Sequence, residues 1–391
     1  MALKQNTWTL NQWYDQDVAG NVSYSGSAEF WYWGLNSYGQ AGQSDQAHRS
    51  SPVQVPGTTW NFVGFSRAGI GAIKTDGTLW TWGKNNAGQL GLSNTTNYSS
   101  PKQVGSGTDW NGVSIGDDAS IASKTDGTLW TFGINTYGAH GTNNTTTTDS
   151  PVQVPGTGWA RVSSSVMSAS VVACKTDGTL WSWGYNNSGG LGLNDRTQRS
   201  SPTQIPGATW PTDGYRKITQ MQSNGFMVIK QDGTLWAWGS NDDGVFGINQ
   251  PTGTLYSSPV QVGSDSTWSK IDSSNNNRYS MGIKTDGTLW CIGGVNTYGN
   301  AGVNDRTRRS SPIQVGSGTD WYDVACDNNF CTAATKTDGT LWTWGRNDQG
   351  QLGQNQPVNS HRSSPVQIPG TDWNGAAIDG GEEGFAALKN I

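Results

Sequence analysis

KTDGTLWTWG, residues 74–83, is a stretch that the chain spells six times with small changes. It returns nearly unchanged at 336–345, and close variants stand at 124–133, 175–184, 230–239 and 284–293. The spacing from the lysine to the last glycine is the same in every copy, which indicates a β-hairpin of fixed register, because a one-residue slip would turn both tryptophans to the wrong face. The Asp-Gly pair predicts a two-residue hairpin loop with positive φ at both residues.

Three further markers recur once per unit. The glycine that closes the motif falls at Gly34, Gly83, Gly133, Gly184, Gly239, Gly293 and Gly345. A Ser-Pro pair recurs at Pro52, Pro101, Pro151, Pro202, Pro259, Pro312 and Pro365. A lone tryptophan recurs at Trp60, Trp110, Trp159, Trp210, Trp268, Trp321 and Trp373. Seven copies of each marker indicate seven units of about 50 residues.

The sequence pattern of each unit indicates four short strands. The sequence therefore predicts an all-β fold: a seven-bladed β-propeller of four-stranded antiparallel blades. The first unit begins with AEFWYWG, residues 28–34, and lacks the strand that precedes this motif elsewhere. That strand is found at the other end of the chain, in GFAALKN, residues 384–390. We expect the C-terminal strand to pair with the N-terminal blade and close the ring, which removes an exposed sheet edge. The propeller then spans 26–391, preceded by an extended arm, 1–25.

The composition excludes several classes of protein. The formal net charge is −5 and charged residues make up 14% of the chain, which disfavours a nucleic-acid partner. No run of 18 apolar residues exists, so we expect no membrane insertion, and the first residues do not resemble a secretory signal. The four cysteines form no CxxC pair, which predicts buried thiols and no metal site: Cys174, Cys291, Cys326 and Cys331.

The order of these motifs resembles a known family. A WxWG strand, an NxxGQLG turn, a proline-led strand and a hairpin at Asp-Gly resemble the regulator of chromosome condensation (RCC1-like) repeat, over roughly residues 26–391. The density of the repetition resembles, within that family, proteins of bacteria and bacteriophages. The resemblance implies a seven-bladed propeller with a terminal clasp. Some members catalyse nucleotide exchange on a small GTPase or sit on chromatin, but no loop here matches theirs, and the histidine common before the Asp-Gly turn is missing.

Most of the 21 tryptophans are expected to pack between blades, because they recur in every unit. Trp8 and Trp13 lie outside the repeats, with Leu10 and Tyr14, in the arm. Two interpretations of the arm remain open. It folds back over its own propeller, or it anchors the ring to a partner by strand addition or hydrophobic insertion.

The loop before each Ser-Pro pair varies most between units, so individuality is expected there. Four arginines share one register in these loops, and a histidine precedes two of them: His48, Arg49, Arg199, Arg309, His361 and Arg362. Either they are solvated charges on one rim, or they form a partly basic rim that meets acidic groups on a protein partner or a glycan. A second irregularity, PTDGYRKITQMQSNG after Trp210, predicts a protruding loop.

No catalytic signature is present. The chain has no Ser-His-Asp arrangement, P-loop or HExxH motif, and the repeated aspartates are turn formers. His140, which replaces a leucine of the GQLG motif, is the one eccentric residue that could serve an enzyme. We therefore expect a protein that is not an enzyme, with no catalytic residues and no cofactor.

The leading hypothesis is a non-catalytic binding or structural module of a virus particle, most consistent with a bacteriophage, made in the host cytoplasm and contacting other virion or surface proteins. Its basis is a surface rich in Asn, Ser, Thr and Gly, the lack of a secretion signal, and the aromatic arm. The alternatives are a bacterial protein-interaction scaffold, in the cytoplasm or on the cell surface, and a nucleotide-exchange or chromatin-type protein. The sequence leaves open the partner, the copy number, the rim used and the binding of carbohydrate.

Overall fold

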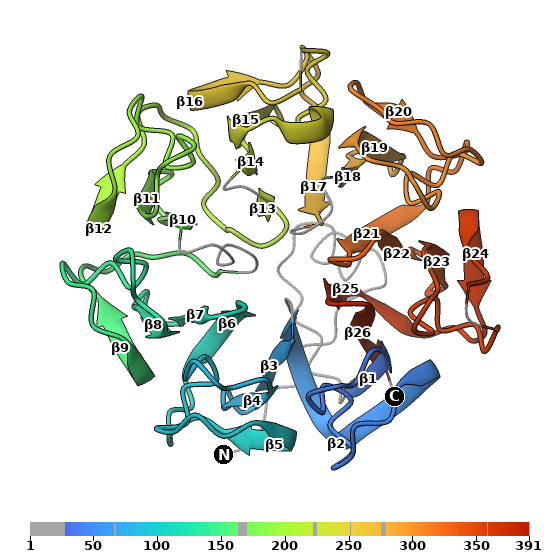
Figure 1. Cartoon of the computed structure of the whole chain (residues 1–391), viewed down its shortest axis with the longest axis horizontal. Coiled ribbons are helices and arrows are strands. Elements are labelled where there is room, and N and C mark those ends of the chain that lie inside the picture. Colours follow the sequence, from blue (N-terminus) through green and yellow to red (C-terminus); the bar gives the residue numbers. More distant parts are fainter. Residues whose placement is uncertain are drawn as a thin grey trace, which may run out of the picture.

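The computed structural model describes residues 28–65, 68–162, 170–221, 225–250, 252–274, 279–357 and 359–390. These residues form an all-β, propeller-like molecule in which antiparallel sheets stand around a central axis (Figure 1). The all-β prediction is confirmed. One short 3-10 helix, η2 (Asp242–Gly244), interrupts the strands. No helix in the described ranges is long and apolar enough to cross a membrane.

Four sheets contain four strands each, in chain order from the axis outward. The first comprises β6 (Trp110–Ile115), β7 (Ala119–Lys124), β8 (Leu129–Gly133) and β9 (Thr148–Val154). The second comprises β13 (Ile218–Met221), β14 (Gly225–Ile229), β15 (Leu235–Ser240) and β16 (Leu255–Gln261). The third comprises β17 (Trp268–Ser273), β18 (Tyr279–Lys284), β19 (Leu289–Gly294) and β20 (Ile313–Gln314). The fourth comprises β21 (Trp321–Cys326), β22 (Cys331–Lys336), β23 (Leu341–Gly345) and β24 (Arg362–Ile368).

A further sheet shows three strands in the described residues: β10 (Ser170–Cys174), β11 (Leu180–Gly184) and β12 (Arg199–Gln204). An isolated bridge joins Trp159 to Lys175 beside it. Trp110 pairs in the same way with Lys124 at the start of a full four-stranded sheet. The lone tryptophan therefore occupies the same register in both sheets.

The last sheet has seven strands, in the order β25 (Trp373–Gly381), β26 (Gly384–Asn390), β1 (Ala28–Gly34), β2 (Arg49–Phe65), β3 (Gly69–Lys74), β4 (Leu79–Gly83) and β5 (Tyr98–Gln103). The described chain thus has six sheets rather than the seven separate ones expected. The physical reason is β2, whose 17 residues run without a break from one four-stranded group, β25-β26-β1-β2, into the next, β2-β3-β4-β5.

The predicted pairing of the two chain ends is confirmed. β26 pairs with β1 over seven residues, from Ala28 opposite Asn390 to Gly34 opposite Gly384. β25 then pairs with β26 on its other edge. The C-terminal hairpin thus supplies the two strands that the first repeat lacks, and both ends of the repeat array lie in one sheet.

Buried indoles join neighbouring sheets. The second tryptophan of the WxW strand has no exposed surface and donates its Nε1–H to a backbone carbonyl of the preceding unit, as Trp82 does to Gln40 at 2.8 Å. Four more such bonds repeat this one: Trp33 to Gln351, Trp183 to Ala139, Trp238 to Gly190 and Trp344 to Asn300. The packing role predicted for these tryptophans is confirmed, and each burial removes roughly 150–250 Å² of side chain from water.

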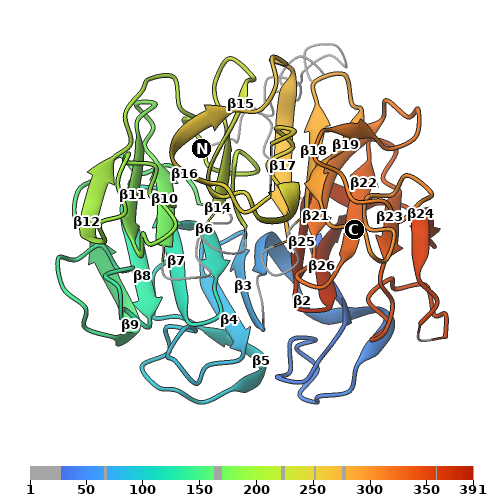
Figure 2. The same cartoon turned by 45° about the horizontal axis from the view of Figure 1, so that its top comes forward.

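Neighbouring sheets stand side by side around the axis, as the tilted view shows (Figure 2). A Cβ placed on Gly64 of β2 would lie 2.0 Å from the carbonyl oxygen of Val113 in β6, so only glycine fits there. Hydrogen bonds also cross between inner strands: the Asp272 carboxylate accepts from the N–H of Cys326, and the Asp379 carboxylate from the N–H of Phe65, both at 2.8 Å. Carboxylates near the axis therefore tie β17 to β21 and β25 to β2.

Candidate functional site

The lysine that opens each KTDG motif lies between two tryptophans. The Lys74 Nζ is 4.1 Å from the ring centroid of Trp80 and 5.0 Å from that of Trp60. The two indoles meet edge to face, 6.3 Å apart. The same stack recurs at Lys124, Lys175, Lys230, Lys284, Lys336 and Lys389. Each stack is worth about 0.5–1 kcal/mol where it is exposed.

The TDGT turn holds the outer indole of the stack in place. The Asp76 Oδ1 accepts hydrogen bonds from both the backbone N–H and the hydroxyl of Thr78, at 3.0 and 2.6 Å. The Thr78 Oγ1 in turn accepts from the Trp80 Nε1–H at 2.8 Å. These bonds hold the pKa of Asp76 below its usual value, the Thr78 hydroxyl first among them. The aspartate is therefore a structural anion, as the sequence predicts.

The predicted geometry of this turn is wrong. The Gly77 N–H bonds to the Lys74 carbonyl at 2.9 Å, so the turn spans four residues, and only Gly77, at φ 76°, has a positive φ among them. Asp76 keeps a negative φ because its carboxylate must reach forward to Thr78. The turn is thus a side-chain-capped turn followed by a left-handed glycine, which needs no strain at the aspartate.

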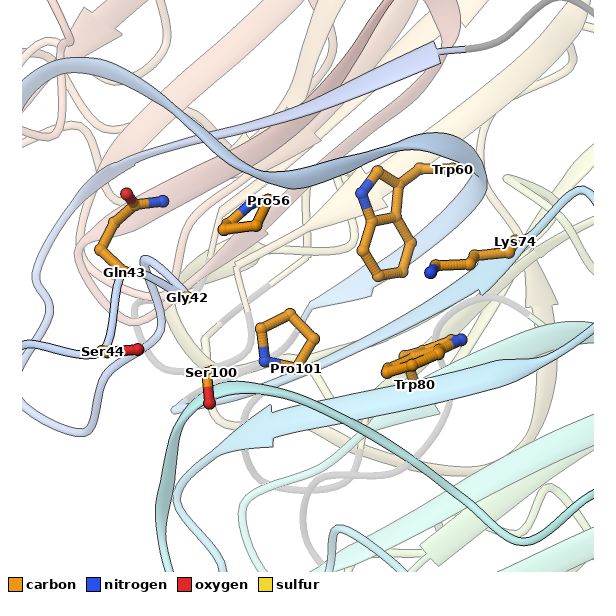
Figure 3. A pocket seen from close by; sticks show the side chains of 9 residues that line it. All are labelled: Gly42, Gln43, Ser44, Pro56, Trp60, Lys74, Trp80, Ser100 and Pro101. Atoms are coloured by element: carbon orange, nitrogen blue, oxygen red, sulfur yellow. The ribbon is translucent and has the colours of Figure 1, made fainter.

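A groove opens beside the Lys74 stack (Figure 3). Its volume is about 330 Å³. Lys74 reaches into it at one end, between the two indoles, and the rings of Pro56 and Pro101 form its middle. Gln43, Ser44 and Ser100 line the opposite end. The groove therefore runs from a cationic end, over apolar walls, to an uncharged polar end.

A second groove, of about 260 Å³, repeats this arrangement at the junction where the chain ends meet. Its residues are the repeat counterparts of the first: Trp31, Pro52, Gln354, Pro369, Trp373 and Lys389. Neither groove has an acidic residue in its lining.

Glutamine distinguishes these two junctions from the others. The residue after the GQLG motif is Gln43 or Gln354 at the grooves, and Leu92, Thr142, Leu193, Ile248 or Val303 elsewhere. Leu92, Leu193, Ile248 and Val303 pack against the apolar clusters of their junctions. The Gln43 amide instead bonds to the carbonyls of Ala41 and Gln54. The polar side chain turns to the backbone and leaves the space open.

The lysines of the stacks also differ in charge balance. Lys124, Lys284 and Lys336 form ion pairs with Asp109, Asp265 and Asp320, at 3.0, 2.5 and 3.1 Å. Thr59 stands at the position of Asp109, and Lys74 makes no ion pair among the described residues. The groove in Figure 3 thus presents a lysine that lies between two indoles and makes no ion pair with a described carboxylate.

The rim arginines are engaged within their own loops. Arg49, Arg199 and Arg309 each pair with an aspartate four residues earlier, at 2.7, 2.7 and 2.5 Å, and bond to a loop carbonyl. Arg362 begins β24. The Nδ1 atoms of His48 and His361 accept the backbone N–H of Asn36 and Asn347, each at 3.0 Å. The structure brings these residues to the loops before the Ser-Pro strands, and their partner-binding role stays a prediction.

The remaining predicted residues divide into two groups. The arm residues Trp8, Leu10, Trp13 and Tyr14 lie outside the described part of the chain. His140 is 1% exposed, and burial lowers its pKa to about 4, so it is an uncharged packing residue at neutral pH rather than a catalytic candidate. The four cysteines are buried and free, as predicted, and burial raises the pKa of each thiol.

The described part of the segment after Trp210, residues 211–221, does not protrude. It runs into the centre of the ring (Figure 1), where the Arg216 guanidinium is 4% exposed and meets three buried carboxylates. The distances are 3.5 Å to Asp272, 3.2 Å to Asp323 and 3.8 Å to Asp379. Arg216 also donates to the carbonyl of Ile378. The prediction of a protruding loop is wrong because a cation is needed at the axis, where inner strands from several sheets bring carboxylates together.

Burial shapes the charge of this axial cluster. It raises the pKa of Asp379 to about 7, although Arg216 acts in the opposite direction. It raises the pKa of Asp272 as well. The Tyr215 ring packs on Phe62 of β2 at 5.7 Å and under the Arg161 guanidinium at 4.5 Å, which extends the contact to β2 and to the segment before β10. The axial cluster is enclosed, so its role is structural.

A third pocket, of about 400 Å³, lies beside the axial segment. Asp213 and Asp232 line it together with Lys217 and Lys230. Its charges balance, so it favours no ligand of one sign as the Lys74 groove does.

Comparison with known proteins supports the family suggested by the motifs. The regulator of chromosome condensation (RCC1) repeat matches residues 76–123, 177–222 and 338–377. The ultraviolet-B receptor UVR8 of Arabidopsis thaliana is 30% identical over 210 residues, 52% of this chain and 45% of that protein. The E3 ubiquitin-protein ligase HERC2 of Mus musculus is 28% identical over 187 residues, 46% of this chain and 4% of that protein. The chain spans less than half the length of these relatives.

Solved structures of similar fold agree. Yeast RCC1 (Prp20), in its complex with Kap60, has a TM-score of 0.78 at 16% identity and covers 93% of this chain and 89% of its own. Human WBSCR16 has a TM-score of 0.76 at 17% identity, with 93% and 99% covered. These likenesses support a propeller-like fold. The relatives named here come from a plant, a mammal, yeast and human, so the bacterial and bacteriophage type stays a prediction.

Proposed function

We propose that this chain is a non-catalytic binding module that holds its partner in the two open grooves, beside Lys74 and Lys389. The observation that carries the proposal is a contrast at the residue after the GQLG motif: glutamine lines the two grooves, whereas in four other units an apolar side chain packs against the cluster of its junction. Filling is the stable solution for a junction, because an open groove forfeits apolar contacts. An open groove that recurs with the same residues is therefore typical of a binding surface.

A photo-crosslinker tests this directly. A benzophenone side chain in place of Ser100 lies in the groove, and one in place of Tyr137, which is 40% exposed, serves as the control on another surface. We expect the Ser100 variant to capture a defined partner from extracts of cells that make the protein, and the Tyr137 variant to capture none. Equal capture at both positions, or none at Ser100, would reject the proposal.

We further propose that the ring has seven blades. The seven-stranded sheet contains two four-stranded groups that share β2. If each group counts as one blade, these two and the five other sheets make seven blades. An experimental density map that showed a gap in the ring, or another number of blades, would reject this count.

A virion role remains our finer proposal for where the module acts, with manufacture in the host cytoplasm. It is supported by the uncharged polar surface, with 14% charged residues, and by the aromatic arm, which would anchor the ring. Purified particles should then contain the protein in a defined copy number. Its absence from such particles would remove the virion role and leave the binding module unaffected.

A further inference from the structure

We propose that the open groove beside Lys74 binds one uronic acid unit of an acidic polysaccharide. This inference rests on the proposed binding function and names its ligand class. Three features of the Lys74 groove carry it: the cation at one end, the aromatic and proline walls, and the uncharged hydroxyl and amide groups at the other end.

The order of these features matches a hexuronate. Its carboxylate stands at one end of the pyranose ring and its free hydroxyls at the other, while the ring presents an apolar C–H face. The Lys74 ammonium would bind the carboxylate, since it makes no ion pair among the described residues and Thr59 stands where Lys124 and Lys336 have their aspartates. The half-buried Trp80 offers a face for the C–H groups, and Ser44 and Ser100 offer hydroxyls. The volume of about 330 Å³ suits a ligand of one or two sugar units.

A peptide fits the same groove poorly. Pro56 and Pro101 form its middle and have no backbone N–H, so a peptide laid along it would find few main-chain donors there. A sugar ring needs no main-chain ladder. The proline walls therefore favour the saccharide over an acidic peptide.

The second groove differs from the first beside its cation. Trp31, Trp373 and Lys389 repeat the stack, and Gln354 repeats the polar end. Asp372, however, stands before Trp373, where the first groove has Thr59. An aspartate at this position pairs with the lysine in the stacks of Lys124 and Lys336. We therefore expect the groove beside Lys389 to bind the acidic sugar more weakly.

Calorimetry with defined probes tests the inference. We expect tetragalacturonate to bind at one tight site per chain, in the Lys74 groove, and neutral galactotetraose and acetate to bind at least about tenfold more weakly. Tighter binding of an acidic proline-rich peptide than of tetragalacturonate would overturn the inference, as would equal affinity for the neutral sugar.

The sister junctions supply the variants. Thr59→Asp introduces the carboxylate that neutralises Lys124, and Gln43→Leu introduces the side chain that fills the next junction. Each should weaken the tight site for tetragalacturonate at least about tenfold, while Lys124→Met should leave its affinity unchanged. Thermal unfolding of each variant verifies that it folds. An unchanged affinity in both groove variants would overturn the inference. If tetragalacturonate does not bind but the Ser100 crosslinker still captures a partner, the ligand class is wrong and the binding function stands.

Discussion

The axis and the grooves of this molecule both contain a cationic side chain, but its surroundings differ between the two regions. Arg216 at the axis is 4% exposed and is surrounded by Asp272, Asp323 and Asp379. Lys74 in the groove lies against two indoles, with no ion-pair partner among the described residues. A buried cation with three carboxylates holds the fold together, whereas a groove lysine that makes no ion pair among the described residues is available to a ligand. A charged side chain alone therefore does not indicate a binding site. The number of opposite charges around it distinguishes a structural cation from one that can bind a ligand.

The largest effect is expected at the axis. Arg216→Met leaves the carboxylates of the cluster without their guanidinium, and breaking a buried ion pair in this way costs about 3–5 kcal/mol. Chemical denaturation should show this loss in the free energy of unfolding. Lys74→Met is the matched change at the groove, and a loss as large as that of Arg216→Met would contradict the contrast between the two regions.

The pH dependence sharpens the same contrast. The pKa of Asp379 is raised to about 7 in the folded protein, so between its ordinary value and about 7 the folded state binds the proton that the unfolded state has lost. The stability contributed by this group is present at low pH and is lost as the pH rises through that window. Without Arg216 the pKa rises further, because the guanidinium lowers it.

Arg216→Met should therefore destabilise the protein more at about pH 7.5 than at about pH 4.5, where the carboxylate is protonated. Urea denaturation at the two pH values measures the difference. An effect of Arg216→Met that is the same at both pH values would show that the axial carboxylates do not titrate against the arginine.

A smaller effect is expected between sister stacks. Lys124→Met removes the ion pair with Asp109 as well as the stack, and Lys74→Met removes the stack alone. We expect losses of about 1–2 kcal/mol for Lys124 and about 0.5–1 kcal/mol for Lys74. Thermal unfolding of the two variants side by side decides the order. The reverse order would mean that the ion pair with Asp109 does not contribute to the free energy of unfolding.

The smallest effect is expected at the rim. Arg199→Gln removes an ion pair with Asp195 whose partners are 29% and 37% exposed, so the loss should be about 0–1 kcal/mol. If this variant keeps its fold but loses a partner in the crosslinking assay, the predicted rim surface would gain support over the grooves.

The repeats made most of the fold predictable. The register of the KTDGTLWTWG hairpin and the pairing of 384–390 with 28–34 follow from constant spacing, because a strand must keep its faces. The continuity of β2 could not be predicted from the sequence, because nothing in VPGTTW, residues 55–60, distinguishes a bend from an extended strand.

The site was harder to predict for a physical reason. The lysine of KTDG is constant, which could have signalled the stack on the lone tryptophan. The opening of a groove, however, depends on one residue, Gln43, which faces a partner more than ten residues away, at Gln54. The axial role of Arg216 depends on strands that lie 56 to 163 residues further along the chain, from Asp272 to Asp379. Contacts between residues so far apart in the chain cannot be predicted from the local periodicity of the sequence.

Competitive labelling of lysines tests the central claim most directly, because it needs no ligand. Brief acetylation followed by mass spectrometry reports the accessibility of each ammonium group. The account predicts that Lys74 reacts faster than Lys124, and that Leu92→Gln with Asp109→Thr raises the rate at Lys124 to that of Lys74. Equal rates at the two lysines in the unaltered protein would contradict it.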